Sequence, residues 1–245
     1  MKLVMFSKHL APLSIEQAAK TAGELGFEGL DLTVRPGGHI EPEQALEALP
    51  AAVKMVRDLG YDIPMITTAI TNASAPYSED IFRAALAEKY EVRANLHIHS
   101  GDFITADGAV VWHILHGRDP DLVGAYIDPG HMAAEGGMSG WKMGMDLLTP
   151  WINLVAIKDM AWIHNFDETL GKERWSTRLV PLKQGLVPWP EVFEYLHDIG
   201  FDGTISVHSE YQGSHSWRDL NLDELLVQTK EDLDYLKGVI ASVWR

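Results

Sequence analysis

The sequence lacks cysteine altogether and has few basic residues. With no cysteine among 245 residues, disulfides and thiolate chemistry are excluded. Lysine and arginine together number 20 against 35 acidic residues, which gives a formal net charge of −15. Binding to nucleic acid without sequence preference needs a basic face, and this composition does not supply one. We therefore expect no DNA or RNA partner.

Long hydrophobic runs are also absent. No apolar stretch approaches the roughly 20 residues that a membrane-spanning helix needs. The apolar run within Met1–Ser7 is too short for the core of a secretory signal and lacks a small-residue cleavage site. We interpret it as a first strand, and we expect a cytoplasmic protein with no membrane partner.

Apolar, strand-like runs alternate with helical patterns along the whole chain. Seven strands are expected near residues 5, 32, 66, 96, 126, 156 and 206. Most of them lie roughly 30 residues apart, which is the length of a β/α unit. Apolar strands separated by helices predict a parallel sheet covered on both faces. The sequence therefore predicts an α/β fold of the TIM-barrel type, which has eight strands when it is closed.

The hydrophobic fraction of 46% is enough for one sizeable core, and no linker interrupts the chain, so we expect one domain over residues 1–245. A long loop rich in Trp, His and Arg is expected at 160–187. Helices are expected at about 14–25, 42–59, 79–90, 107–116, 138–148, 189–199 and 222–239.

Four of the expected strands end in ionisable residues. These residues are His97 and His99, Asp128, Lys158, and His208 with Glu210. Parallel β/α folds place their chemistry at the carboxyl ends of strands, so we expect these side chains to share one polar site. Carboxylates and imidazoles suit a divalent metal such as Mn²⁺, Zn²⁺ or Fe²⁺, and they also suit general acid–base catalysis.

Structural explanations compete with the functional ones at these positions. His208 lies deeper in its strand and is better explained as a hydrogen-bonded core residue, whereas His97 suits either role. Asp128 precedes a Pro-Gly turn that it could simply cap, although His131 on the same loop favours a functional role. Lys158 could belong to a solvated strand end or to an internal ion pair. Glu210 is the hardest to explain as structure, because burying it unpaired would be costly.

A second cluster follows the second expected strand, at Arg35-Pro36-Gly37-Gly38-His39. Arg35 could pair with Asp31, or it could bind an anionic or polyol substrate. In the long loop, Trp162 and Trp175 are candidate walls of a sugar pocket, although some of the eight tryptophans must be structural.

At these residues the chain resembles the xylose isomerase-like TIM-barrel superfamily, the group of sugar phosphate isomerases and epimerases. The resemblance spans nearly the whole chain and is carried by several short segments in a fixed order. They are Gly26–His39, His99-Ser100-Gly101, Asp128-Pro129-Gly130-His131, Ile157-Lys158-Asp159, Pro181–Gly185 and Gly203–Tyr211.

The resemblance implies a divalent metal held by Glu, Asp, His and Glu from successive strands, with the two glutamates moving protons. By position, Asp128 and Glu210 match two of these ligands, and His131 matches a histidine that contacts substrate. Two positions depart from the pattern, because His97 replaces the first Glu and Ala156 replaces the metal-binding His. The proposed metal ligands are therefore Asp128, Glu210 and His97, a weaker set than the family's own.

The family also has a further strand and helix where the segments at 82–85 and 88–90 run together in this chain. The fourth β/α unit is expected to be missing, which accounts for seven strands. Such a barrel must leave sheet edges exposed or cover them, for example in a homo-oligomer.

The resemblance implies an isomerase or epimerase acting on a sugar, sugar phosphate or polyol by proton transfer next to a carbonyl. Proton abstraction is assigned to Glu210 or His97, and the enolate charge to Lys158 or a metal. Substrate contacts are expected from His99, His131, Arg35, His39, Trp162 and Trp175. An inosose dehydratase-like lyase and a non-catalytic sugar-binding relative remain alternatives.

Overall fold

The computed structural model describes residues 1–71, 77–88 and 92–244. By its internal contacts the chain divides into two compact units, each described here by itself. The first unit comprises residues 1–94 and 204–207, and the second comprises residues 95–203 and 208–245. The single domain expected from the sequence stays a prediction.

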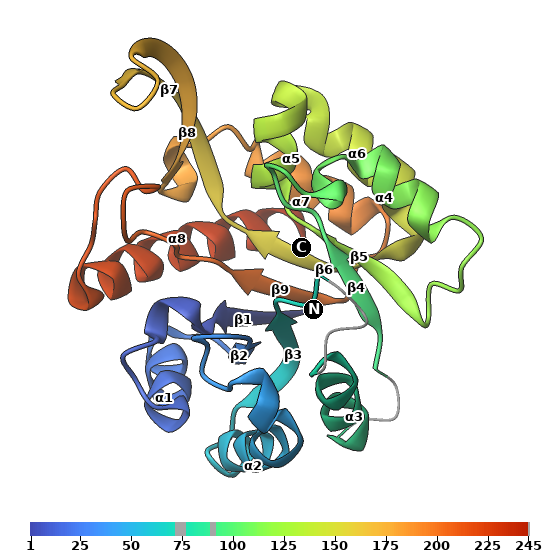
Figure 1. Ribbon diagram of the computed structural model, residues 1–245. Helices are drawn as coiled ribbons and strands as arrows, with labels where there is room; N and C mark the ends of the chain where they lie inside the picture. Colours follow the sequence, from blue (N-terminus) through green and yellow to red (C-terminus); the bar gives the residue numbers. More distant parts are fainter. Residues whose placement is uncertain (72–76, 89–91, 245) are drawn as a thin grey trace. The chain divides into compact units, whose positions relative to one another are not determined.

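The first unit contains four parallel strands in the order β3-β2-β1-β9 (Figure 1). Their bounds are Lys2–Phe6 for β1, Gly29–Val34 for β2, Asp62–Thr68 for β3 and Thr204–Val207 for β9. Every residue of β2 is buried, as expected for a strand covered on both faces. The register pairs Lys2 with Thr204, so the start of the chain aligns with a strand some two hundred positions later.

The helices of the first unit begin and end close to where the sequence predicts. Helix α1 (Ile15–Leu25) has a capping box between Ser14 and Gln17, and it ends at Gly26 with φ of +102°. Helix α2 (Ala45–Asp58) follows a short 3₁₀ turn at Pro42–Gln44. Helix α3 (Ser78–Glu88) starts one residue earlier than expected. Its expected end at Tyr90, and with it part of the junction where a β/α unit is missing from the sequence, lies outside the described residues.

In the second unit, three strands besides a hairpin lie side by side in the order β6-β5-β4 (Figure 1). Their bounds are Ala94–His97 for β4, Val123–Ile127 for β5 and Ile152–Ile157 for β6. Its helices are α4 (Gly108–Leu115), α5 (Pro129–Gly136), α6 (Gly140–Leu148), α7 (Trp189–Asp198) and α8 (Leu222–Val243). Helix α5 lies where the sequence analysis considers a Pro-Gly turn that Asp128 could cap. Asp128 is the N-cap of that helix and Pro129 occupies its first turn.

The predicted loop at 160–187 is largely a β-hairpin. Strands β7 (Asp159–Asp167) and β8 (Lys172–Val180) pair antiparallel over their whole length and extend beyond the helices of the second unit (Figure 1). Gly171 closes the turn with φ of +63°, a backbone conformation that glycine adopts without strain. The loop prediction was wrong because both faces of this ribbon are partly solvated, which blurs the usual alternation.

Within the described residues, seven parallel strands alternate with helices, which is the succession of an incomplete TIM-type barrel. The fold class and the strand number predicted from the sequence are confirmed. Among the described residues, no helix combines the length and the hydrophobicity that a membrane span requires.

Candidate active site

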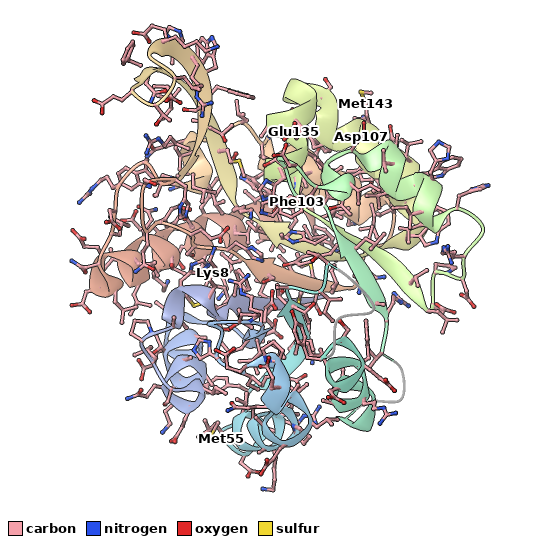
Figure 2. The ribbon with its side chains drawn as sticks, in the orientation of Figure 1. Lys8, Met55, Phe103, Asp107, Glu135 and Met143 are labelled. Carbon is pink, nitrogen blue, oxygen red and sulfur yellow. The ribbon has the colours of Figure 1, made fainter. Side chains whose placement is uncertain are left out.

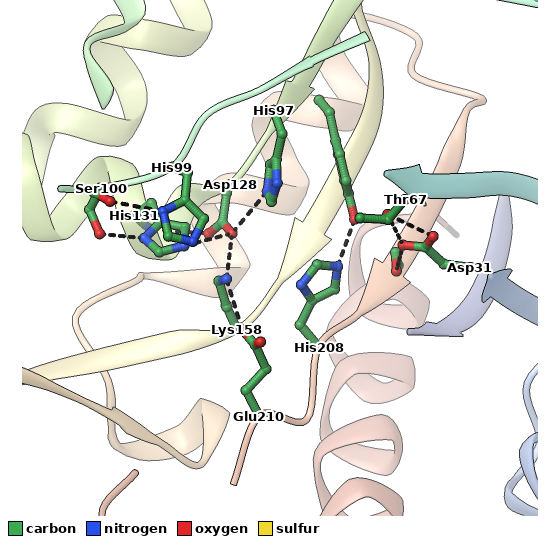
Figure 3. Close-up of polar contacts among 12 residues, drawn as sticks. Asp31, Thr67, His97, His99, Ser100, Asp128, His131, Lys158, His208 and Glu210 are labelled. Atoms are coloured by element: carbon green, nitrogen blue, oxygen red, sulfur yellow. Dashed lines mark hydrogen bonds and ion pairs between the residues drawn. The ribbon is translucent and has the colours of Figure 1, made fainter. Parts of the chain in front are cut away.

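The candidate site of the second unit is centred on the side chain of Lys158, which follows β6 directly (Figure 3). The residue is 2% exposed, and its Nζ donates to Glu210 Oε2 at 3.0 Å. The same Nζ lies 3.4 Å from Asp128 Oδ2. Burial alone would lower the pKa of Lys158, but Glu210 and Asp128 outweigh it and raise that pKa. The ammonium charge is therefore maintained at neutral pH between two carboxylates.

Asp128 joins this ion pair to the imidazoles around it. Its Oδ1 accepts the His131 backbone N–H at 3.0 Å, as the N-cap of α5. Its Oδ2 lies 3.4 Å from His97 Nε2 and 3.6 Å from His131 Nε2. Complete burial would raise the pKa of Asp128, but His131, Lys158 and His97 hold it well below its usual range. The structural explanation of Asp128 therefore holds, since it caps a helix, whereas its functional role stays a prediction.

His97 ends β4, and its ring stacks on Tyr126 with centroids 4.3 Å apart. Its side chain is 25% exposed, which leaves it open to a ligand. Tyr126 in turn contacts His208, with its hydroxyl 2.7 Å from His208 Nε2. His208 is 2% exposed, so its prediction as a hydrogen-bonded core residue agrees with the structure.

A second pair of histidines lies beside this group. The His99 and His131 rings are tilted against each other with centroids 3.9 Å apart. Burial lowers the pKa of His131 to about 2, and burial together with the charge of Lys158 lowers the pKa of His99. Both rings are therefore uncharged at neutral pH, which suits contacts with hydroxyl groups rather than with anions.

Close packing at Gly130 holds the helix start against the end of β6. A Cβ atom on Gly130 would lie 2.4 Å from the Lys158 backbone oxygen, so only glycine fits here. The Pro-Gly pair after Asp128 thus positions the carboxylate and the lysine together.

Asp159 does not pair with Lys158, although the two are neighbours in sequence. Its carboxylate accepts backbone N–H groups of Met160, Leu186 and Val187, and the indole N–H of Trp189 at 2.9 Å. Burial raises the pKa of Asp159 to about 7. The Asp159 side chain therefore connects the first residues of β7 to the segment at 186–189, which follows the hairpin.

The other four predicted substrate contacts belong to the hairpin and to the first unit. Trp162 and Trp175 are on the hairpin, 45% and 62% exposed. Arg35 and His39 belong to the first unit, where the Arg35 guanidinium lies 5.6 Å from the centre of the Phe6 ring. His39 Nδ1 is 3.3 Å from Thr33 Oγ1. These four assignments stay predictions.

Two residues of the site were given no role by the sequence analysis. Tyr126 lies in β5 two positions before Asp128, which follows the strand directly, and this spacing could have identified it. Ser100 contacts both His99 and His131, and it was noted only as part of a resembling segment.

The fold and this cluster define an α/β barrel-type protein with a polar site at its strand ends. The chain belongs to the xylose isomerase-like TIM-barrel family, whose model matches residues 1–238. No curated protein matches the sequence.

Among solved structures, the chain is similar to a probable 3-DHS dehydratase, AsbF, from Bacillus anthracis, with 17% identity and a TM-score of 0.65 over 96% of this chain and 99% of that one. It is also similar to D-psicose 3-epimerase with D-tagatose from Clostridium cellulolyticum H10. The identity is 15% and the TM-score is 0.62, over 98% of this chain and 99% of that one. A third similar structure is a xylose isomerase-like TIM-barrel protein from Mycobacterium smegmatis in complex with magnesium. The identity is 15% and the TM-score is 0.58, over 100% of this chain and 98% of that one. At these identities the likeness shows the fold alone.

The residues present do not fit the divalent metal that the family pattern implies. Among the described residues, no group of three or more His, Cys, Asp or Glu side chains is arranged to hold a metal ion. The reason lies in the donor set, since Ala156 offers no ligand atom and the Lys158 ammonium already lies against Asp128 and Glu210. A divalent cation at the same carboxylates would meet strong repulsion from that ammonium.

Proposed function

We propose that this chain is an isomerase or epimerase that transfers a proton at the carbon next to the carbonyl of a sugar or related polyol. The observation that carries the proposal is the buried Lys158 ammonium, held between Asp128 and Glu210 beside His97. Structures of related fold with D-fructose and D-tagatose support a small sugar as the ligand class. A cytoplasmic location and a homo-oligomer stay predictions.

Lys158 would stabilise the negative charge that develops on the substrate oxygen. When a base removes the proton next to a carbonyl, the electron pair of that C–H bond moves to the carbonyl oxygen and forms an enolate. A fixed ammonium in a buried site stabilises this oxyanion far better than water does. Asp128 keeps Lys158 charged, and because its own pKa is depressed it remains a carboxylate throughout. In this proposal Lys158 supplies the positive charge that the family pattern assigns to a metal ion.

Glu210 and His97 are the two candidate bases. Glu210 already contacts Lys158, so the carboxylate that removes the proton would lie next to the ammonium that receives the oxyanion. His97 approaches the same group from the end of β4, and its partly exposed imidazole can accept or return a proton. Return of the proton to the opposite face of the same carbon gives an epimer. Return to the former carbonyl carbon, with transfer of the neighbouring hydroxyl proton to the former carbonyl oxygen, gives an isomer.

The proposal is tested by incubating the protein with a panel of ketoses and aldoses in D₂O and following proton NMR spectra. The expected result is deuterium incorporation next to the carbonyl of at least one sugar, together with an epimer or isomer as product. His97→Ala and Glu210→Ala should each abolish it. Turnover that persists in both variants would remove the assigned bases.

Other outcomes of the same experiments would support the two alternative functions, a lyase or a sugar-binding protein. A dehydrated product in the same spectra would identify a lyase, in which the same enolate expels hydroxide. Saturable sugar binding by calorimetry without any exchange would identify a binding protein. Either result would replace the isomerase proposal.

A further inference from the structure

Ser100 contacts two imidazoles through its two different oxygens (Figure 3). Its backbone oxygen lies 2.8 Å from His99 Nδ1, and its hydroxyl oxygen lies 2.6 Å from His131 Nδ1. Both distances are within the range of good hydrogen bonds. Ser100 therefore contacts the Nδ1 atom of each of the two histidines.

The contact with His99 fixes where that ring carries its proton. A carbonyl oxygen can only accept a hydrogen bond, so His99 Nδ1 must donate and must carry the hydrogen. In an uncharged ring the other nitrogen is then an acceptor. His99 Nε2 is therefore left with a lone pair.

The contacts of His131 fix the opposite arrangement. Its Nε2 lies 3.6 Å from Asp128 Oδ2, and the same carboxylate oxygen lies 3.4 Å from the Lys158 ammonium. A hydrogen on Nε2 is attracted to the carboxylate charge, whereas a lone pair there would be repelled. The Nδ1 of an uncharged His131 therefore accepts, and the Ser100 hydroxyl is its donor.

The loop that carries Ser100 is held in place by its surroundings. Gly101 adopts φ of +100°, which only glycine adopts without strain. Its backbone N–H donates to Glu135 Oε1 at 2.9 Å, and Figure 2 labels this glutamate on α5. The serine is thus fixed between the end of β4 and helix α5, where both of its oxygens can contact the two rings.

We propose that Ser100 is a positioning residue that sets opposite tautomers on His99 and His131. With its hydrogen donated to His131, the Ser100 hydroxyl oxygen can only accept from a ligand, and His99 Nε2 can only accept as well. Two acceptors in the site that also holds the Lys158 donor match a substrate that carries both hydroxyl groups and a carbonyl, such as a ketose. This substrate assignment rests on the proposed function, whereas the tautomers do not.

Long-range proton–nitrogen NMR of the ¹⁵N-labelled full chain distinguishes the two neutral histidine tautomers directly. The sequence has 11 histidines, so His99→Gln and His131→Gln variants assign the two signals by their loss. The expected spectrum shows the hydrogen on Nδ1 of His99 and on Nε2 of His131. The same tautomer on both rings, or the reverse pair, would overturn the proposal.

Ser100→Ala removes the hydroxyl and keeps the backbone carbonyl. His131 should then lose its single tautomer while His99 keeps its own, and Ser100→Thr should restore the original pattern. Ser242→Ala is the matched control, because that hydroxyl donates to the Val239 backbone within α8. A His131 signal that is unchanged in Ser100→Ala would contradict the assignment.

Kinetics separate this proposal from the proposed function. For a ketose that turns over, Ser100→Ala should raise KM about tenfold and change kcat less, as expected when one hydrogen bond to substrate is lost. An analogue lacking the contacting hydroxyl should show no such difference. The predicted tautomers without any turnover would overturn the proposed function and its substrate class alone, whereas turnover with the wrong tautomers would overturn the role of Ser100 alone.

Discussion

Replacement of Lys158 by methionine tests the buried ion pair most sharply. Methionine has a similar length and flexibility without the charge, so it removes the cation and leaves little empty volume. Asp128 and Glu210 then lose the cation that lies between them. We expect a large loss of stability together with loss of turnover.

The magnitude follows from the two distances. At an effective dielectric constant of about 20, a charge pair at 3.0 Å or 3.4 Å contributes about 5 kcal/mol of attraction for each carboxylate. Part of this attraction offsets the cost of burying the lysine, so the net loss is smaller. Removing one partner of a buried ion pair destabilises proteins by about 3–5 kcal/mol, and we expect Lys158→Met to fall in this range.

Urea unfolding followed by tryptophan fluorescence measures this loss. All eight tryptophans lie in the second unit, so the signal reports on the unit that contains Lys158. Lys230→Met is the matched control, because Lys230 pairs with Asp234 on α8 with side chains 45% and 59% exposed. Such exposed pairs contribute about 0.5 kcal/mol or less. If Lys158→Met destabilised no more than Lys230→Met, the reasoning about the buried charge would be refuted.

Three further results are expected. His97→Gln and Glu210→Gln should each slow deuterium incorporation by about 10²–10⁴-fold, and a normal rate in both would exclude them as bases. Gly130→Ala should destabilise by about 1–3 kcal/mol, because its Cβ would lie 2.4 Å from a backbone oxygen at the end of β6. Gly136→Ala on the same helix, with open space around its Cβ, should be neutral in the same urea assay. Burial raises the pKa of Asp232 from 3.8 to about 6, so the stability it contributes is present below pH 4 and lost as the pH rises to about 6. In urea titrations from pH 4 to 7, Asp232→Asn should show a smaller decline than the unchanged protein, because the decline due to Asp159 remains, and an identical slope in both proteins would contradict the prediction.

The strand endings could be predicted from the sequence because parallel β/α folds follow simple rules. Apolar runs of the right length predicted seven strands, and a polar residue after each of several runs predicted a shared site. The structure brings His97, Asp128, Lys158 and Glu210 together as expected. The pairing of Lys158 with two carboxylates could not be read from the sequence, because it depends on which side chains meet across strands.

The errors have physical causes of the same kind. The β7–β8 hairpin is partly exposed on both faces, so its residues carry no strong hydrophobic pattern, although Gly171 was a usable turn signal. Helix α5 begins with Asp128-Pro129-Gly130, a combination that turns and helix starts share. The role of Ser100 depends on its contact with the ring of the preceding residue, His99, and on its contact with the ring of His131 in α5, and no local sequence pattern predicts the second contact.

The measurement that tests the central claim most directly is the rate of deuterium incorporation by protein stripped with a chelator, with its metal content checked by elemental analysis. If Lys158 supplies the charge that stabilises the enolate, the stripped protein should exchange at the rate of the untreated one, and Lys158→Met should not exchange. A rate that disappears on stripping and returns with Mn²⁺ or Mg²⁺ would show that a metal ion, and not the lysine, does this work.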